Sequence, residues 1–458
     1  MKSNMKKILY AISVVAMLSS CGIYTTYHRP DDVKTQNLTG RTVVEESKDS
    51  LPSWQEFFTD PALQKLIEQG LKNNSDLRTA QLKVTESQAS LTAARLAFLP
   101  TLTLSPSGTL SSFNGNTPSK VYSLSAAAGW QMDVFGSLRN AKERSKAVLE
   151  QTKNYRQAVQ AQIIATIAND YYSLLLLDSQ LKISEKTMEN WKQLVETYRA
   201  LMEAGSANQT SVSQAQANYL SVCASVADLK KKIKDLEDSF STLLGDVPHY
   251  IERNEWNPDQ LDVANFTEKG IPLYLLAQRP DVKRSEQTLA AAFYATNEAR
   301  SAFYPSISLS GTAGWTNSSG MGIVNPGKIL LTAVGSLTQP VFQGGKLIAQ
   351  YKISKAQQEE AKLDFQQTLL NAGMEVNSDL SQMQTAREKR IYYKKQITAL
   401  TVAVNSTKLL MDNGSTTYLE VLTANQNLLS AQLNDLSNSF DELQSYILLY
   451  QALGGGCK

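Results

Sequence analysis

Apolar residues recur at two different spacings along this chain, and the spacing changes in the same order in its two halves. Residues 123–134 read SLSAAAGWQMDV, which places Leu124, Trp130 and Val134 on one face and mostly small or polar residues on the other. Alternation at every second residue indicates a strand with one apolar and one polar face. Such runs predict strands at about 100–111, 121–134 and 305–316, and a less regular run predicts a fourth at about 329–342.

After each strand pair the apolar residues recur every three or four positions over a very long stretch. Between 144 and 204 this spacing runs from Val148 to Met202. It predicts a coiled-coil-like helix about 90 Å long, at a rise of about 1.5 Å per residue. Gly205 and Gly414 follow the two longest seams, as glycine often does at helix ends. The expected helices are at about 138–204, 208–244, 346–412 and 416–453.

The two halves also share residues at a fixed offset. Residues 93–100 read AARLAFLP and residues 298–305 read EARSAFYP, so Pro100 and Pro305 are 205 positions apart. Further along, Leu244-Gly245 matches Leu453-Gly454 at an offset of 209. A period this long exceeds a solenoid unit of roughly 20–50 residues. It indicates a duplication over about 70–245 and 275–454.

The chain is therefore expected to contain five segments. We assign 1–20 to a signal peptide, 21–51 to a lipidated linker, 52–270 to the first repeat, 271–454 to the second repeat, and 455–458 to a tail. Each repeat contributes one strand hairpin and one long helical hairpin.

The N-terminus has the pattern of an export signal. Lysines at 2, 6 and 7 precede a short apolar run, Ile8–Leu18, and then Ser19-Ser20-Cys21. About eleven apolar residues are too few to span a bilayer, and they are typical of a signal peptide. Small residues before a cysteine resemble the bacterial lipobox, which predicts that Cys21 is lipidated. The alternative is an ordinary signal peptide with a chance cysteine.

Composition excludes several function classes. The formal charge is +2, and removal of three signal-peptide lysines gives 2 − 3 = −1, so nothing suggests a nucleic-acid partner. The two histidines, His28 and His249, are far apart, and no protease, hydrolase or P-loop motif is present. We therefore expect no enzyme, catalytic residue, cofactor or metal site. Cys223 is expected in a helix seam and Cys457 on the tail, and their spacing gives no support to a disulfide.

The predicted elements constrain the architecture. The fold class is mixed but mainly α, with four amphipathic strands per chain. Four strands are too few to close a membrane barrel, and open strand edges are forbidden in lipid. Several chains must then share one outer-membrane β-barrel, and the long hairpins continue it as a periplasmic helical barrel.

Several motifs in order resemble the TolC-like outer-membrane efflux protein family, in its lipoprotein branch. They are PSWQEFFTDPALQKLI (52–67), WQMDVFGSLR (130–139), QRPDV (278–282), EARSAFYPSISLSG (298–311) and QPVFQGG (339–345). The resemblance covers about 52–454. It places strand-to-helix junctions at Trp130, Asp133, Phe135, Gly136, Pro340, Phe342 and Gly344.

The resemblance implies a homotrimer with a twelve-stranded barrel in the outer membrane. It also implies a periplasmic adaptor protein and an inner-membrane pump, typically of the proton-driven resistance–nodulation–division class. The expected function is a passive duct that exports small toxic compounds. Two alternatives remain: a duct for ATP-driven type I protein secretion, and a structural lipoprotein without transport. Ten scattered methionines do not favour metal export over drug export.

The resemblance further implies two kinds of site at the helical tips. Gly205, Ser206, Gly414 and Ser415 match the turns that contact the adaptor, although the glycines could simply end helices. Many relatives carry an acidic gate residue directly before the alanine that matches Ala424. Here Thr423 and, in the first repeat, Gln214 occupy that place. Glu420 and Leu419 are substitute gate candidates, against the alternative of simple solvated positions.

Overall fold

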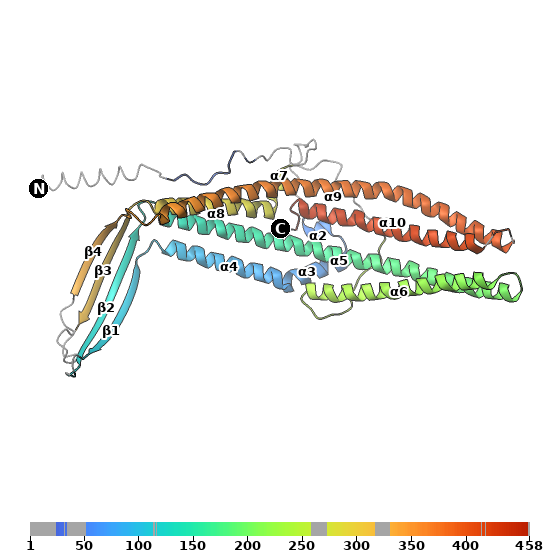
Figure 1. Cartoon of the computed structure of the whole chain (residues 1–458), viewed down its shortest axis with the longest axis horizontal. Coiled ribbons are helices and arrows are strands. Elements are labelled where there is room, and N and C mark those ends of the chain that lie inside the picture. The colour runs from blue at the N-terminus through green and yellow to red at the C-terminus, as the bar shows by residue number, and fades with distance from the viewer. Residues whose placement is uncertain are drawn as a thin grey trace. The chain divides into compact units, whose positions relative to one another are not determined.

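The computed structural model of the chain describes residues 24–31, 33, 52–112, 115, 117–257, 273–316, 330–413, 415–416 and 418–456. The signal peptide, Cys21, Gly414 and Cys457 lie outside the described residues. The described elements are α2 Trp54–Phe57, α3 Pro61–Asn73, α4 Ser75–Leu96, β1 Thr101–Ser111, β2 Ser119–Met132, α5 Ser137–Glu203, α6 Gln209–Leu243, α7 Leu273–Gln278, α8 Pro280–Ser301, β3 Ser306–Thr316, β4 Leu330–Thr338, α9 Lys346–Asp412 and α10 Tyr418–Ala452 (Figure 1).

The chain forms two compact units, and each unit contains segments of both repeats. The first comprises the described parts of Met1–Lys34 with Leu82–Lys153 and Arg284–Gln367, and therefore holds all four strands. The second comprises the described parts of Thr35–Gln81, Asn154–Lys283 and Thr368–Lys458, and is helical. A repeat in sequence is thus not a compact unit in space.

The first unit contains a four-stranded antiparallel sheet in the order β1-β2-β3-β4, which confirms four strands per chain. Two strands end earlier than the alternation predicts. β2 ends at Met132, because the next residue, Asp133, caps α5 instead of pairing. β4 ends at Thr338, two residues before Pro340, which has no backbone N–H to donate to a ladder.

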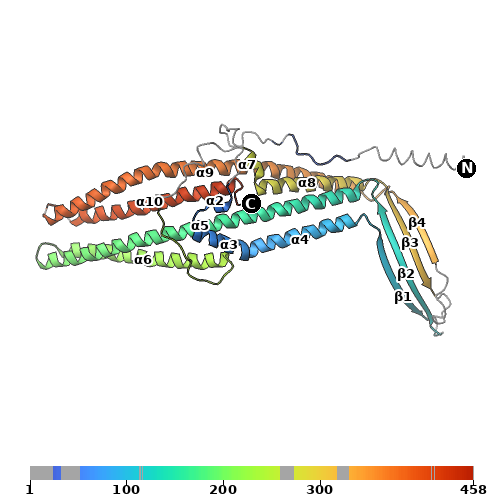
Figure 2. The same ribbon diagram turned by 180° about the vertical axis from the view of Figure 1, so that it is seen from behind.

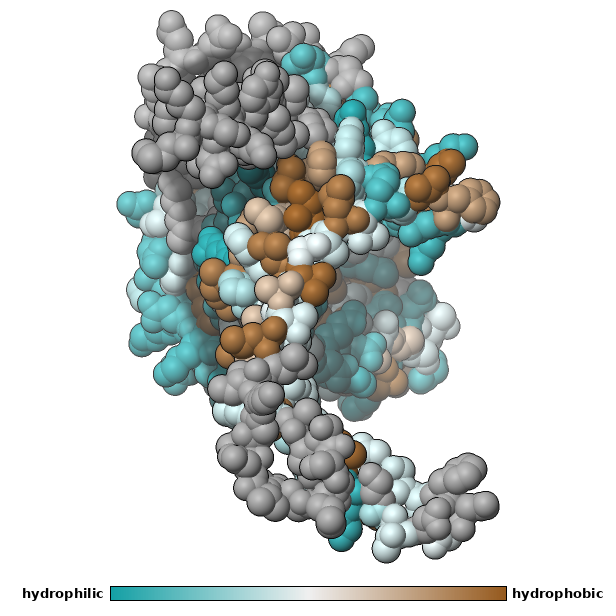
Figure 3. All heavy atoms as spheres, turned by 90° about the vertical axis from the view of Figure 1, so that its left-hand side faces the viewer, coloured by the Kyte–Doolittle hydropathy of each residue, from teal (hydrophilic) through white to brown (hydrophobic). Residues whose placement is uncertain are grey.

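The register of the sheet gathers apolar side chains on one face and small polar ones on the other. Leu104 pairs with Ala126, Ala126 with Ala313, and Ala313 with Leu331. On the opposite face the hydroxyl oxygens of Ser107 and Ser123 lie 2.6 Å apart, and those of another cross-strand pair, Ser308 and Ser336, are also 2.6 Å apart. Figure 3 faces this end of the molecule and shows a band of hydrophobic residues on its surface. Apolar residues on this face are exposed, Leu102 at 79% and Leu331 at 75%, so no layer of the described residues covers them.

The second unit is built from long antiparallel helix pairs. α5 lies beside α6, and α9 beside α10, in both ribbon views (Figures 1 and 2). The short helices α2 and α3 seal one side of the core, where Trp54 and Ile67 pack with Ile167, Phe240 and other buried side chains. Among the described residues, no helix combines the length and the apolar content that a membrane-spanning helix requires.

The duplication is visible as two equivalent turns in this unit. Asn74 donates its side-chain N–H to the carbonyl of Leu243 at 2.9 Å, and Arg279 donates to the carbonyl of Ala452 at 3.0 Å. Donor and acceptor positions are offset by 205 and 209, as the sequence repeat predicts. Gly245 follows with φ +74°, and a Cβ there would lie 2.9 Å from a backbone oxygen, so glycine is required at this turn.

Candidate functional site

The first strand-to-helix junction is a closely bonded turn. The two carboxylate oxygens of Asp133 accept the backbone N–H groups of Leu138 at 2.9 Å and Arg139 at 2.8 Å, which satisfies the otherwise unpaired start of α5. Gly136 has φ +74° within the turn. Phe135 stacks on Tyr304 with ring centroids 5.3 Å apart. The predicted residues Asp133, Phe135 and Gly136 therefore lie together at one turn.

Trp130 ties this junction to the preceding helix. Its indole N–H donates to the carbonyl of Phe98 at 2.9 Å. In the second repeat the side chain of Gln339 donates to the carbonyl of Phe303 at 3.0 Å. Since Phe98 and Phe303 are matching residues of the repeat, both junctions are fastened at the same point by different side chains.

The second junction is more open. Phe342 is 87% exposed, and a Cβ added to Gly344 would meet no atom within 4 Å. Pro340 separates this turn from β4. A large aromatic side chain that is exposed at such an open turn marks a surface that a further layer of protein or lipid can cover.

The two helical tips share one turn geometry. The N–H of Ser206 donates to the carbonyl of Leu201 at 2.8 Å, and the N–H of Ser415 donates to the carbonyl of Leu410 at 2.8 Å. Gly205 has φ +73°, and a Cβ there would meet nothing within 4 Å. The tip of the first hairpin therefore exposes backbone and small side chains that a partner can approach closely.

The four gate candidates are all exposed in the described chain: Gln214, Leu419, Glu420 and Thr423. Thr416 donates its hydroxyl to the Glu420 carboxylate, and Thr423 donates its hydroxyl to the Leu419 carbonyl at 2.7 Å. The structure of one chain places them in the first two turns of α6 and α10 and leaves their role as a prediction.

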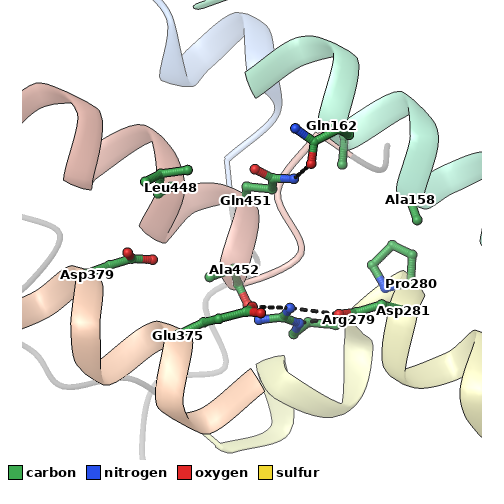
Figure 4. Close-up of a pocket in the computed structure, with 11 residues that line it drawn as sticks. Ala158, Gln162, Arg279, Pro280, Asp281, Glu375, Asp379, Leu448, Gln451 and Ala452 are labelled. Atoms are coloured by element: carbon green, nitrogen blue, oxygen red, sulfur yellow. Dashed lines mark hydrogen bonds and ion pairs between the residues drawn. The ribbon is translucent and has the colours of Figure 1, made fainter. Parts of the chain in front are cut away.

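An ion-pair cluster around the buried side chain of Arg279 was not predicted from the sequence (Figure 4). The guanidinium donates to both carboxylate oxygens of Asp281 at 3.0 and 2.7 Å, and to Glu375 at 2.6 Å. Burial alone would lower the pKa of Arg279, but the two carboxylates raise it, so the cation persists at every working pH. The motif QRPDV contains Arg279 and Asp281, yet nothing in it points to Glu375.

The Arg279 cluster borders a pocket of about 440 Å³ that also includes Gln162, Asp379 and Gln451. Burial, with a smaller effect from Glu375, raises the pKa of Asp379 to about 6. Figure 4 shows the Asp379 carboxylate apart from the cluster, and no ion pair joins it to Arg279 among the described residues. The pocket thus couples a permanent cation to a carboxylate that titrates near neutrality.

A second buried arginine fixes the connection that follows α6. Arg253 donates to Asp178 at 2.5 and 3.1 Å, to Glu237 at 2.7 Å and to the carbonyl of Ile251 at 2.8 Å. Its side chain is 5% exposed. No periodic pattern marks this segment in the sequence, because the connection belongs to neither helical pattern.

The described residues include no group of three or more histidine, cysteine, aspartate or glutamate side chains that could hold a metal ion. Cys223 is a free, half-buried thiol on α6. The arrangement of these sites offers structural ion pairs, capped turns and exposed amphipathic faces.

Comparison with known proteins gives a consistent result. The family model described as Outer membrane efflux protein matches residues 66–246 and 272–455. The cation efflux system protein CusC of Escherichia coli K12 is 27% identical over 453 residues, covering 98% of this chain and 99% of that protein. The solvent efflux pump outer membrane protein SrpC of Pseudomonas putida is 27% identical, with 96% of each covered. The probable outer membrane lipoprotein SilC of Salmonella typhimurium is 26% identical, with 98% of each covered. A crystal structure of CusC superposes with a TM-score of 0.85 at 27% identity, covering 95% of this chain and 100% of that one.

Proposed function

The chain belongs to the outer membrane efflux protein family, whose members are non-enzymatic outer-membrane channels, and on this premise we propose that it is the duct of a tripartite system that exports small toxic compounds. One observation carries the proposal. A sheet with one continuous apolar face is joined to two long helical hairpins in a single duplicated chain.

The sheet supports the sharing of one barrel by several chains, and the proposal assigns three chains to it. β1 and β4 are the outer strands of the four-stranded order, so each has one edge without a partner in the chain. An unpaired edge in lipid costs several kcal/mol per unsatisfied group, and closure removes that cost. Three chains would supply twelve strands, within the range of known membrane barrels.

The tips suit the adaptor that such a system needs. Gly205 and Ser206 are exposed at the end of the first hairpin, and Ser415 occupies the same turn position in the second. Small residues let another helix approach the backbone closely. We assign these positions, together with Gly414, to adaptor contact, and assign the driving force to an inner-membrane pump, proton-driven in this proposal, because the chain shows no energy-coupling motif.

The lipid anchor is assigned to Cys21. The sequence around it resembles a lipobox, and the relative SilC is described as a probable outer membrane lipoprotein. Two acyl chains give stable membrane attachment, where one chain gives only marginal binding.

The cargo class rests on the relatives' names, which include cation and solvent efflux. Because relatives of one family serve such different cargos, we assign the choice of compound to the pump rather than to the duct. The gate candidates Gln214, Leu419, Glu420 and Thr423 are proposed to set the width and charge of the closed end instead.

Dye accumulation in energised cells tests the proposal. We would compare a deletion strain, the same strain carrying this chain, and the wild type. Higher dye retention in the deletion strain, restored by the chain, is the expected result. Equal retention in all three, with a loss of secreted proteins in the deletion strain, would replace small-molecule export by ATP-driven protein secretion.

A further inference from the structure

The first strand-to-helix junction holds a pocket that the proposed channel function does not use. Its volume is about 450 Å³, and its lining includes Tyr24, Phe98, Val134, Arg139, Lys142 and Glu143. All of these residues belong to the first compact unit. The aromatic and aliphatic side chains supply an apolar wall, and the start of α5 supplies the polar one.

The polar wall carries a net positive charge. Arg139 and Lys142 are its cations and Glu143 is its one carboxylate, so the count is 2 − 1 = +1. Glu143 already accepts an ion pair from Lys142 at 3.0 Å. Within the part of the chain that the structure describes, the guanidinium of Arg139 makes no ion pair. The backbone N–H of the same residue donates to the Asp133 carboxylate. A planar guanidinium with five N–H donors suits the oxygens of a phosphate group.

The N-terminal segment forms one side of the pocket, which makes the site specific to the first repeat. A Cβ added to Gly136 would lie 3.1 Å from the ring of Tyr24, so the ring rests directly on this turn. At the second junction, a Cβ added to Gly344 or Gly345 would meet nothing within 4 Å. The Tyr24 hydroxyl is buried and has no hydrogen-bond partner among the described residues.

The N-terminal segment is itself held firmly on this unit. Arg29 donates to both oxygens of the Glu286 carboxylate at 2.8 and 2.6 Å and lies 5.6 Å from the ring centre of Phe365. The backbone N–H of Tyr27 donates to the Tyr294 hydroxyl at 3.3 Å. These contacts keep Tyr24 at the pocket without help from any bound molecule.

The position of the pocket relative to the strand ends indicates which class of ligand it binds. Phe98 lies three residues before β1, and Val134 lies two residues after β2, so the pocket is within about 10 Å of both strand ends. If the strands cross the outer membrane, as the proposed function requires, this level is the headgroup layer of the periplasmic leaflet, roughly 5–7 Å thick. Tyr24 is three residues from Cys21, so an acylated Cys21 would enter the same leaflet within about 10 Å.

We propose that this pocket binds the phosphate headgroup of an anionic phospholipid of the periplasmic leaflet, with Arg139 and Lys142 on the phosphate and Phe98 and Val134 along the first part of an acyl chain. The proposal rests on the proposed function, since it needs the strands in the membrane. The bound lipid would join the anchor segment, the sheet and the start of α5 at one point of the membrane surface.

Native mass spectrometry of the purified full chain in detergent tests this assignment. Phosphatidylglycerol and phosphatidylethanolamine of equal chain length are titrated against the wild type, Arg139→Gln/Lys142→Gln and Lys346→Gln. Lys346 begins α9 at the open second junction, so its loss removes a cation from an equivalent site without a pocket. We expect the wild type and Lys346→Gln to retain phosphatidylglycerol in preference, and the double variant to bind it about tenfold more weakly. The charge-preserving Arg139→Lys/Lys142→Arg variant should retain most of the binding.

Equal retention of both lipids by the wild type, or equal retention by the double variant and Lys346→Gln, would overturn the lipid site. Displacement of phosphatidylglycerol by the same concentration of inorganic phosphate would overturn the lipid assignment, because a free anion would then suffice. Lipid retention is measured on purified protein and dye efflux in cells. A failed efflux test therefore refutes the proposed function, and a failed lipid test refutes only this site.

Discussion

At the scale of single residues, Arg253 is the clearest determinant of stability in the helical unit. Its guanidinium neutralises the charge of the Glu237 carboxylate, whose side chain is only 8% exposed, and it also forms an ion pair with Asp178. Replacing one partner of a buried ion pair leaves the other charge uncompensated, which costs about 3–5 kcal/mol. Arg253→Met is therefore expected to lower the thermal unfolding midpoint of the purified protein clearly.

The matched control is Lys182→Met. Lys182 pairs with Glu255 at 3.3 Å, but the two side chains are 75% and 91% exposed, and an exposed pair contributes little. We expect this variant to unfold at the wild-type temperature. If both variants unfolded at the same temperature, the buried cluster would have no special role.

Asp379 gives a residue-scale prediction about pH. Burial raises the pKa of this carboxyl from 3.8 to about 6, so the folded protein binds a proton here that the unfolded chain releases. Binding of this proton stabilises the folded protein. The contribution to the free energy of unfolding is complete below about pH 4 and is lost as the pH rises through about 6. Asp379→Asn should therefore stabilise the protein by about 1 kcal/mol at pH 7.5, after allowance for partial exposure, and not at pH 4.

Unfolding of this variant is measured at both pH values beside Asp228→Asn, which changes an exposed aspartate of α6. A stabilising effect of the same size at pH 4 would contradict the assignment of the effect to ionisation. Asp170 occupies the matching position of the first repeat, and burial raises its pKa to about 6 as well. The same experiment on Asp170→Asn should give the same sign.

At the scale of elements, the helical tip offers a direct test of partner contact. Ser206 is exposed, and its backbone N–H already satisfies the turn, so a large side chain there should leave the hairpin intact. Ser206→Trp is expected to abolish in-cell cross-linking to the adaptor and to raise dye retention to the deletion level. Ser225→Trp, an equal change at an exposed position within α6, should do neither. Normal cross-linking of Ser206→Trp would exclude the tip as the adaptor contact.

The helices and strands were largely predictable from the sequence, because each keeps a regular spacing of apolar residues over a long run. α5 and α9 each have 67 residues and α6 and α10 each have 35, which matches a duplication with an unchanged helical pattern. The strands followed from alternation, except for the ends of β2 and β4, where the helix cap at Asp133 and the missing N–H of Pro340 stop the pairing. The complete Arg253 and Arg279 clusters could not be predicted, because each includes one distant partner. Asp178 lies 75 residues from Arg253 and Glu375 lies 96 residues from Arg279, so they meet only through packing.

The site was predictable only where a family motif covers it. The family resemblance placed Asp133 and Gly136 at this junction, and the structure shows their local roles: Asp133 caps the start of α5 and Gly136 forms a left-handed turn. The role of Glu420 depends on which residues of other chains face it, and one sequence carries no such information. The pocket beside Tyr24 was missed because it joins the N-terminal segment to α5 and α8, which are far apart in sequence.

At the scale of the whole molecule, attachment of the chain is expected to depend on Cys21. Cys21→Ser removes the thiol that would be acylated, so the protein should no longer incorporate labelled fatty acid, and its signal segment should not be removed. Cys223→Ser, which changes a thiol on α6, should be labelled like the wild type. Undiminished labelling of Cys21→Ser would refute lipidation at this cysteine.

Assembly is the second property at this scale, and the open edges of the sheet determine it. Thr103 lies on edge strand β1, and the register places it on the same face as Thr332, Val334 and Ser336 of edge strand β4. If β1 of one chain pairs with β4 of the next, a cysteine at 103 combined with one at 332, 334 or 336 should form disulfides between chains. The background is a chain whose native cysteines other than Cys21 are replaced.

The size of the largest cross-linked product shows how many chains form the barrel, because cross-linking stops once the ring of chains is closed. Three chains give one closed barrel, so non-reducing gels should show a ladder that ends at three chains for at least one pair. Cysteines at Ala126 and Ala313, which are direct partners on β2 and β3 inside one chain, should give only monomers. A ladder that continued past three chains, or one that ended at two, would show that the sheets close differently and would remove the twelve-stranded barrel from the proposal.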